Sequence, residues 1–444
     1  MILFFRRSVL ARNTLWMFAG QGVRLFIQAL YFTLIARSLG AANYGAFVAV
    51  AALIAVVYPF GSLGSGNLLI KDVSRNQATF AACLGHALLI TAVTSSILFT
   101  CVTLLARFVL PGSIPILLVC LVAGADLFGQ SVVVICNQAF QAFERLHWMA
   151  IISVSFSASR LLAAVVLVLV NRHPSALQWG YGYFASTAII CTFALVLVLT
   201  RLGRPRFVIR RSPAELREGL YFSISLSAQT IYNDVDKTML ARLGSLDATG
   251  IYGAAYRLIE VSFVPAWSLL AAAYPKFFRA GSGGMSATFH YAKRLLVRVL
   301  AYAALGTLGI LLCAGVVPYF LGPEYARTVE ALRWLAPILV LRAIHSFLAD
   351  ALTGAGHQGL RSAIQASVAA FNILINFWLI PAYSWRGAAW SSILSDGLLA
   401  CGIGAAAIVL SRRSVVPAAV RQGDLWRDAE LTAQQLATTA INDQ

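Results

Sequence analysis

The sequence predicts an all-α polytopic membrane protein, with twelve transmembrane helices in two six-helix lobes that form a parallel pseudo-repeat around a central cleft. The first observation is composition, because 59% of the 444 residues are hydrophobic and only 11% are charged. Soluble domains carry about twice this charge fraction. The second observation is a series of long apolar segments, and the third is a motif that occurs near the start of each half of the chain.

Twelve segments reach the length of about 20 apolar residues that a helix needs to cross a hydrocarbon core of about 30 Å. Backbone amides and carbonyls in that core must bond within the protein, so each segment is expected to be a helix. The segments cover residues 13–37, 43–63, 80–106, 113–136, 147–171, 177–200, 217–242, 248–274, 294–320, 327–353, 361–382 and 387–411. No signal-peptide pattern follows Arg6 and Arg7, so the first segment is expected to be retained.

The repeated motif divides the chain into two halves. The stretch LIARSLGAANYGAF at 34–47 matches MLARLGSLDATGIYGAAY at 239–256 through shared Ala-Arg and Tyr-Gly pairs. Six segments separate the two copies, and this even number predicts repeats related by an axis along the membrane normal. The predicted parts are an N-terminal lobe (1–205), a basic cytoplasmic linker (206–216), a C-terminal lobe (217–412) and a cytoplasmic tail (413–444).

Basic residues in the connections predict the orientation of the chain. Connections on one side carry 21 Lys and Arg residues, whereas those on the other side carry six. Cytoplasmic loops are enriched in these residues, so both termini are predicted to be cytoplasmic. The net charge of +17 does not indicate nucleic-acid binding, because the basic residues are scattered between apolar segments.

Ionisable residues within or near the segments predict a polar cavity. A charge at the centre of a membrane helix costs about 2.5–3.5 kcal/mol on insertion scales, so such groups normally face the bundle interior or water. The basic ones are Arg24, Arg160, Lys237, Arg257, Arg298, Arg333 and Arg342, and the acidic ones are Asp126, Asp234, Asp236, Glu260, Glu330, Asp350 and Asp396.

Helical spacing groups several of these residues. The first segment carries a polar stripe of Gln21, Arg24, Gln28 and Tyr31, and the seventh carries one of Gln229, Asn233, Asp236 and Lys237. Three pairs at i,i+3 can neutralise each other locally, namely Asp234 with Lys237, Arg257 with Glu260, and Glu330 with Arg333. Arg24 has no acidic residue within one turn, so it needs a partner across the cleft or an anionic ligand.

The predicted lining suits a phosphorylated glycan attached to a lipid. Arginine binds phosphate through two parallel hydrogen bonds, and amide and phenol groups offer donors and acceptors to sugar hydroxyls. The predicted substrate-binding residues are Arg24, Arg257, Gln28, Gln21, Arg160, Lys237 and Asn233.

Four stretches resemble the polysaccharide transporter, or oligosaccharidyl-lipid (O-antigen) flippase, branch of the multidrug/oligosaccharidyl-lipid/polysaccharide exporter superfamily. They are ARSLGAANYGAF, FGSLGSGNLLIKDVSRN, DKTMLARLGSLDATGIYGAAYRL and AAYPKFFRA, and the likeness covers about residues 10–412. The resemblance implies a flippase that moves an undecaprenyl-diphosphate-linked oligosaccharide from the cytoplasmic to the outer leaflet of a bacterial inner membrane. The oligosaccharide would be a repeat unit of O-antigen, capsule or exopolysaccharide.

The resemblance also implies roles for single residues. Basic residues on the first and eighth helices of such flippases contact the diphosphate, and Arg24 and Arg257 occupy those places. Asp236 and the stretch 250–252 match the helix-seven Asp and G-x-Y of the family, although the second segment lacks the charge that fuller cationic linings carry. By hypothesis, Asp236, with Asp126 as a second candidate, binds H⁺ or Na⁺ and couples transport to an ion gradient.

Two other function classes stay open. A multidrug or cation antiporter of the same superfamily would prefer a net acidic lining, and a membrane glycan polymerase or ligase would usually carry a large outer loop. No catalytic, metal-binding or nucleotide-binding motif occurs, so neither enzymatic activity nor a cofactor other than the coupling ion is expected. We expect a monomer that contacts membrane lipids and no nucleic acid, with polysaccharide polymerase or assembly proteins as candidate partners.

Overall fold

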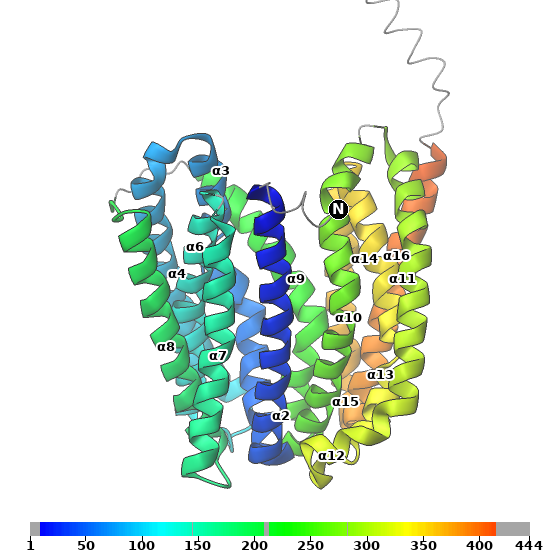
Figure 1. Ribbon diagram of the computed structural model, residues 1–444. Coiled ribbons are helices and arrows are strands. Elements are labelled where there is room, and N and C mark those ends of the chain that lie inside the picture. Colours follow the sequence, from blue (N-terminus) through cyan, green and yellow to red (C-terminus); the bar gives the residue numbers. More distant parts are fainter. Residues whose placement is uncertain (1–8, 144, 208–212, 282, 414–444) are drawn as a thin grey trace, which may run out of the picture. The chain divides into compact units, whose positions relative to one another are not determined.

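The computed structural model describes residues 9–143, 145–207, 213–281 and 283–413, and over these residues it contains helices and no strands (Figure 1). The all-α prediction is confirmed. The first helix, α2 (Val9–Val57), contains both the first and the second predicted segment. Gly40 divides it, because its backbone angles of φ 70° and ψ 168° are not helical and lie where only glycine is readily accommodated.

Helices cover all twelve predicted segments. After α2 they are α3 (Ser65–Arg75), α4 (Phe80–Val109), α5 (Ile116–Ala123), the π-helical η3 (Gly124–Gln130), α6 (Ser131–Ala142), α7 (Leu146–Val170), α8 (Ala176–Arg201), α9 (Pro213–Leu243), α10 (Leu246–Gly281), α11 (Met285–Cys313), α12 (Val317–Leu321), α13 (Thr328–Leu335), α14 (Ile338–Gly354), α15 (Gln358–Tyr383) and α16 (Trp385–Arg413). The short helix α3 was not predicted.

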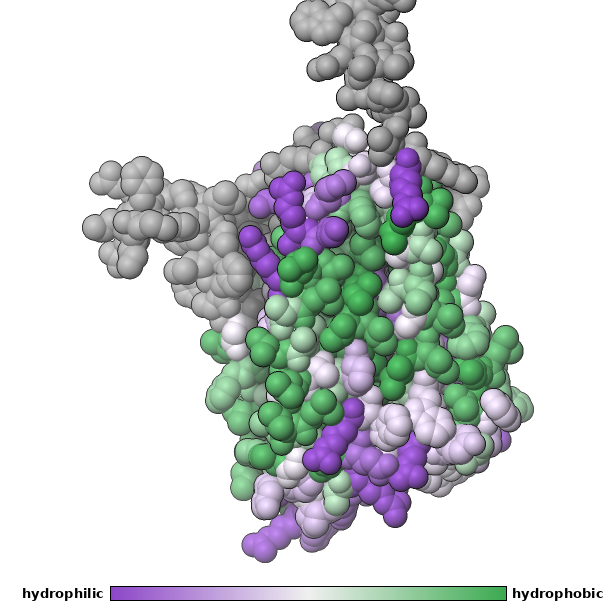
Figure 2. Space-filling model, turned by 90° about the vertical axis from the view of Figure 1, so that its right-hand side faces the viewer, coloured by the Kyte–Doolittle hydropathy of each residue, from purple (hydrophilic) through white to green (hydrophobic). Residues whose placement is uncertain are grey.

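Nine helical stretches within the described residues are long and apolar enough to cross a membrane. This count treats the two segments of α2 as one stretch and does not include α9 or α10. The protein is therefore a multi-pass membrane protein, and the number of twelve spans stays a prediction. On the face in Figure 2, many exposed residues are hydrophobic, as in a protein that contacts lipid.

The chain forms two compact units. The first contains Met1–Val264, Leu305–Leu339 and Gln365–Asp396, and the second contains Pro265–Ala304, Val340–Ile364 and Gly397–Gln444. The first unit includes residues from both predicted lobes, so the lobe boundaries and the pseudo-repeat stay predictions.

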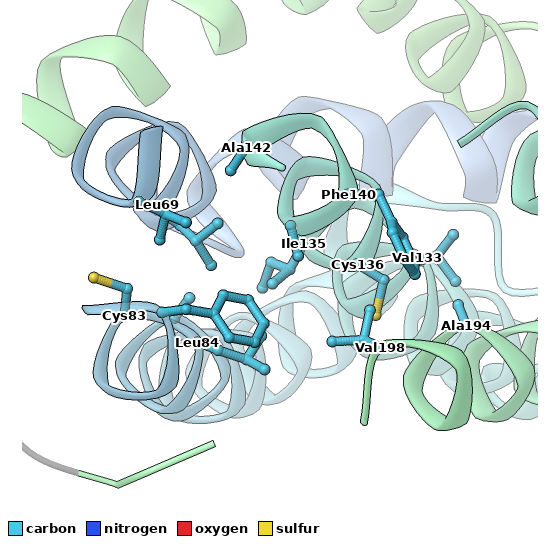
Figure 3. Packing of buried hydrophobic residues seen from close by; sticks show 14 of the residues in the cluster. Leu69, Cys83, Leu84, Val133, Ile135, Cys136, Phe140, Ala142, Ala194 and Val198 are labelled. Atoms are coloured by element: carbon cyan, nitrogen blue, oxygen red, sulfur yellow. The ribbon is translucent and has the colours of Figure 1, made fainter. Parts of the chain in front are cut away.

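A hydrophobic core joins α3, α4, α6 and α8 within the first unit (Figure 3). Leu69, Leu84, Phe140 and Val198 are fully buried in it. Close van der Waals packing of Leu69 with these side chains explains why α3 packs against its neighbours although part of its sequence is polar.

The two copies of the repeated motif pack against each other in the first unit. A Cβ on Gly45 of α2 would overlap the backbone carbonyl of Leu246, and one on Gly250 of α10 would overlap the backbone carbonyl of Ala41. Small residues allow this close backbone contact, as they commonly do between membrane helices.

Two hydrogen bonds from another segment of the same unit secure α2 on either side of its break at Gly40. The Ala41 amide donates to the Glu324 carboxylate over 3.1 Å, and the Tyr325 hydroxyl donates to the Ala36 carbonyl over 2.9 Å. The break at Gly40 leaves the Ala41 amide without a partner in the helix, and the Glu324 carboxylate accepts a hydrogen bond from it.

Candidate functional site

The first unit contains a cavity of about 260 Å³ lined by residues of α2, α7, α8, α9 and α10. Its basic lining residues are Arg160, Lys237 and Arg257, and its acidic ones are Asp234 and Glu260. Six aromatic residues also line it, namely Tyr31, Phe32, Tyr44, Phe47, Tyr183 and Tyr256. The cavity therefore combines positive charge, hydrogen-bonding groups and flat apolar surfaces.

Lys237 lies in a dense set of contacts on α9 and α10. Its ammonium group forms an ion pair with Asp234 and donates to the Asn233 carbonyl over 2.8 Å. It also lies 3.9 Å from the centroid of the Tyr256 ring, within the range of a cation–π interaction. The predicted pairing of Asp234 with Lys237 is confirmed, so most of the Lys237 charge is neutralised at the cavity wall.

Arg257 forms the predicted i,i+3 pair with Glu260, and their nearest atoms are 3.0 Å apart. The two side chains are 40% and 33% exposed, so solvent screens this pair and a ligand can reach it. Arg24 of α2 is half-buried and close enough to Arg257 for the two positive charges to repel each other. No described carboxylate forms an ion pair with Arg24.

Arg160 on α7 reaches the cavity from beside two buried groups. Its guanidinium lies 3.7 Å from the centroid of the Tyr183 ring, and its Nη2 is 3.6 Å from Oδ1 of Asp126. The Tyr183 hydroxyl donates to the same oxygen over 2.9 Å. Asp126 is buried behind the cavity and is not a lining residue.

Asp236 is fully buried and does not line the cavity. Its carboxylate accepts hydrogen bonds from the hydroxyls of Tyr252 on α10 and Ser392 on α16, the latter over 2.9 Å. A separate set of buried hydrogen bonds lies near Ser392 in the sequence. It links Asn376 to Asn372 over 3.0 Å, Asn372 to Ser395 over 2.9 Å, and Ser391 to Asn376 over 2.6 Å.

The structure thus sorts the predicted site residues into groups. Arg160, Lys237 and Arg257 line the cavity, and Asn233 lies beside the lining residue Lys237. Arg24 is not a lining residue, although its charge interacts with that of Arg257. Gln28 is half-buried but is not a lining residue, whereas the side chain of Gln21 lies outside the described residues. Asp126 and Asp236 lie behind the wall.

Two features were missed or wrong. Tyr183 was not predicted, because it lies in an uncharged segment and only its place beside Arg160 shows its importance. The predicted pair of Glu330 with Arg333 is wrong, since Glu330 instead pairs with Arg386 over 2.8 Å. The Arg386 guanidinium donates two hydrogen bonds to this carboxylate, which is a stronger arrangement than a single contact along one helix.

Residues 10–280 match the family described as "Polysaccharide biosynthesis protein". The chain belongs to this family. The match includes α2, the cavity and the repeated motif. No curated protein matches the chain significantly.

Solved structures share the fold of this family member. An inward-facing multidrug-resistance MATE transporter of the MOP superfamily matches with a TM-score of 0.72 and 14% identity, over 88% of this chain and 98% of that one. The lipid II flippase MurJ, in an inward closed conformation, matches with a TM-score of 0.72 and 12% identity, over 92% and 91%. A MOP superfamily transporter from Pyrococcus furiosus matches with a TM-score of 0.64 and 14% identity, over 90% and 96%. At these identities the likeness establishes the fold alone.

Proposed function

We propose that this membrane transporter is a flippase that moves an undecaprenyl-diphosphate-linked oligosaccharide from the cytoplasmic to the outer leaflet by alternating access. The observation that carries the proposal is the cavity, where Arg160, Lys237 and Arg257 meet six aromatic side chains. Guanidinium groups suit the oxygens of a diphosphate. Aromatic faces and hydroxyls suit sugar rings, while the lipid tail would stay in the bilayer.

Charge balance supports an anionic substrate. Lys237, Arg257 and Arg160 each have a carboxylate partner, whereas no described carboxylate pairs with Arg24. Arg24 and Arg257 also repel each other, so an anion between them would relieve that repulsion and gain two charge-assisted contacts. The proposal therefore assigns Arg24 and Arg257 to the diphosphate. Gln28, Asn233 and Gln21 stay proposed as further substrate-binding residues.

The same balance favours the flippase over the multidrug cation antiporter. A cation needs an unpaired carboxylate in the cavity, but both acidic lining residues already pair with a basic neighbour, Asp234 with Lys237 and Glu260 with Arg257. MurJ, which shares this fold, is a lipid II flippase, and this likeness also supports the proposal of a flippase.

The close packing of α2 on α10 supports alternating access. Gly45 and Gly250 bring the two helices together at the end of the cavity near Tyr44. By the distribution of basic residues this end faces outward, so a closed outer end is the arrangement expected of a transporter that loads from the cytoplasm.

Asp236 is proposed as the group that binds the coupling ion, with Asp126 as the second candidate. A fully buried carboxylate held by two hydroxyls can exchange a proton or a small cation for part of its hydrogen bonding. We further propose a monomer in the bacterial inner membrane, without enzymatic activity, that works alongside polysaccharide polymerase or assembly proteins.

Reconstituted vesicles test the proposed function directly. A fluorescent undecaprenyl-diphosphate oligosaccharide is placed in proteoliposomes, and an external quencher reports its transfer between leaflets. Arg24→Ala and Arg257→Ala should each slow transfer by about 10- to 100-fold, because each loses a charged hydrogen-bonding group worth roughly 1.5–3 kcal/mol. Arg24→Lys should recover little, since lysine lacks the planar fork.

The matched control is Arg298→Ala, which removes an exposed arginine of α11 that does not line the cavity. It should transfer the lipid at the wild-type rate. Wild-type transfer by Arg24→Ala and Arg257→Ala would overturn the proposal. Transfer of a lipophilic cation but not of the anionic lipid would favour the antiporter.

A further inference from the structure

The ion pair between Arg160 and Asp126 is longer than the pair between Arg257 and Glu260. Its nearest atoms are 3.6 Å apart, compared with 3.0 Å for Arg257 and Glu260. A distance of 3.6 Å is beyond the usual hydrogen-bond range, so Asp126 attracts the guanidinium without binding it tightly.

Other groups hold the Arg160 guanidinium in place. It lies 3.7 Å from the centroid of the Tyr183 ring and 4.5 Å from that of Phe156, and its Nη2 donates to the Thr187 hydroxyl over 3.4 Å. Its Nε is buried and has no hydrogen-bond partner in the described part of the chain. Arg160 is thus held at the cavity wall by its ring contacts and by one long hydrogen bond, and these contacts do not neutralise its charge.

Asp126 has a second partner that does not depend on Arg160. The Tyr183 hydroxyl donates to its Oδ1 over 2.9 Å, which is the same oxygen that faces Arg160. The backbone that carries Asp126 is the π-helical segment η3, and the Ser95 hydroxyl fixes the next carbonyl, that of Leu127, over 2.6 Å. The carboxylate is therefore held at one place behind the cavity wall.

Only some of these residues are accessible from the cavity. Arg160 and Tyr183 line the cavity, while Asp126 does not. A phosphate in the cavity can reach Arg160 but not its carboxylate partner. The negative charge of Asp126 beside the same guanidinium opposes the binding of a second anion there, so the phosphate and Asp126 compete for the charge of Arg160.

We propose that Asp126 is a displaceable counter-ion, which yields Arg160 to a phosphate of the bound substrate and recovers it when the substrate leaves. Tyr183 is the positioning residue, because its hydroxyl compensates Asp126 while the phosphate holds Arg160. The competition keeps binding moderate, which a transporter needs in order to release its cargo. This inference rests on the proposed function and names how affinity is regulated at the same cavity.

Substitutions at Asp126 and at Tyr183 are expected to change the affinity for a diphosphate in opposite directions. Asp126→Asn keeps the shape and an acceptor for Tyr183 but removes the competing charge, so affinity for a diphosphate should rise about tenfold and release should slow. Tyr183→Phe removes only the hydroxyl, so Asp126 depends more on Arg160 and affinity should fall about three- to fivefold. A purely structural role would weaken binding in both variants.

The test measures binding of undecaprenyl diphosphate to the purified full-length protein in detergent, with undecaprenol as the uncharged probe. The diphosphate is expected to bind most tightly to Asp126→Asn, less tightly to the wild type and most weakly to Tyr183→Phe. Undecaprenol should bind all three proteins equally. Asp350→Asn is the matched control, since it removes the carboxylate of the buried pair with Arg361 in the second unit and should bind as wild type does.

Each outcome decides between the two proposals. If the wild type does not bind undecaprenyl diphosphate, the proposed function fails and this inference fails with it. If the wild type binds but Asp126→Asn binds equally or more weakly, only the displaceable counter-ion is overturned. If Asp126→Asn does not fold, Tyr183→Phe decides, because weaker binding of the diphosphate alone supports the inference and unchanged or tighter binding overturns it.

Discussion

Replacing Gly45 with alanine should separate α2 from α10. A Cβ at this position would overlap the backbone carbonyl of Leu246 and come within 2.7 Å of the Gly250 amide nitrogen. Real Cβ atoms do not approach other heavy atoms this closely, and backbone atoms cannot rotate away as a flexible side chain can. The packed arrangement therefore has to open, or the helices have to shift along each other.

The size of the effect follows from the cost of an extra methyl group in a tightly packed contact. Overpacking costs typically 1–3 kcal/mol, and 1.4 kcal/mol changes an equilibrium tenfold. The ratio of packed to separated molecules should then fall by about 5- to 150-fold. The same residue change at Gly309 of α11 meets no atom within 4 Å, so Gly309→Ala is the matched control.

Spin labels measure this separation. Cysteines introduced at Ala42 and Asp247, both exposed and both in the first unit, carry the labels in a background without the seven native cysteines. Gly45→Ala should move the distance distribution to longer values, and Gly309→Ala should leave it unchanged. An unchanged distribution in Gly45→Ala, with normal thermal stability, would show that the contact with Leu246 does not hold these helices together.

Four further substitutions test other contacts by thermal unfolding of the purified protein. Tyr325→Phe removes a buried hydroxyl that donates to a carbonyl of α2, so stability should fall by about 1 kcal/mol, and no loss would mean that water replaces this bond. Arg361→Ala should cost about 3–5 kcal/mol because it leaves a buried carboxylate unpaired, whereas Arg386→Ala breaks an exposed pair worth about 0–1 kcal/mol; equal losses would contradict this reasoning. Asn376→Leu leaves buried amide and hydroxyl partners unsatisfied and should cost about 1–3 kcal/mol or more, so a stabilised variant would refute the role of this hydrogen-bond set.

Local patterns predicted the helices well. The length and hydropathy of a segment decide whether it can cross a bilayer, and both are properties of consecutive residues. The break in α2 also lies at a glycine between two predicted segments. Helix α3 was not predicted, because its polar residues lower the hydropathy of the segment. Its apolar face is recognised only from the packing of Leu69 in the core.

Contacts along one helix were predictable, whereas contacts between helices were not. The pairs Asp234 with Lys237 and Arg257 with Glu260 follow from the i,i+3 spacing of an α-helix. The same spacing gave the wrong partner for Glu330, whose carboxylate bonds Arg386 from another helix. The i,i+3 spacing considers residues of one helix only, so it cannot predict that the fold places Arg386 beside Glu330.

By itself, the sequence determined that this chain is a helical membrane protein with ionisable groups placed inside its apolar segments, because hydrophobic length and charge are local quantities. Only the tertiary structure decided which of those groups share a cavity. It brought Arg160 beside Tyr183 and Asp126, each on a different segment, and it placed Asp236 behind the wall rather than on it. The physical reason is that packing decides which helices become neighbours and which of their side chains meet, and the hydropathy of a single segment does not encode its neighbours.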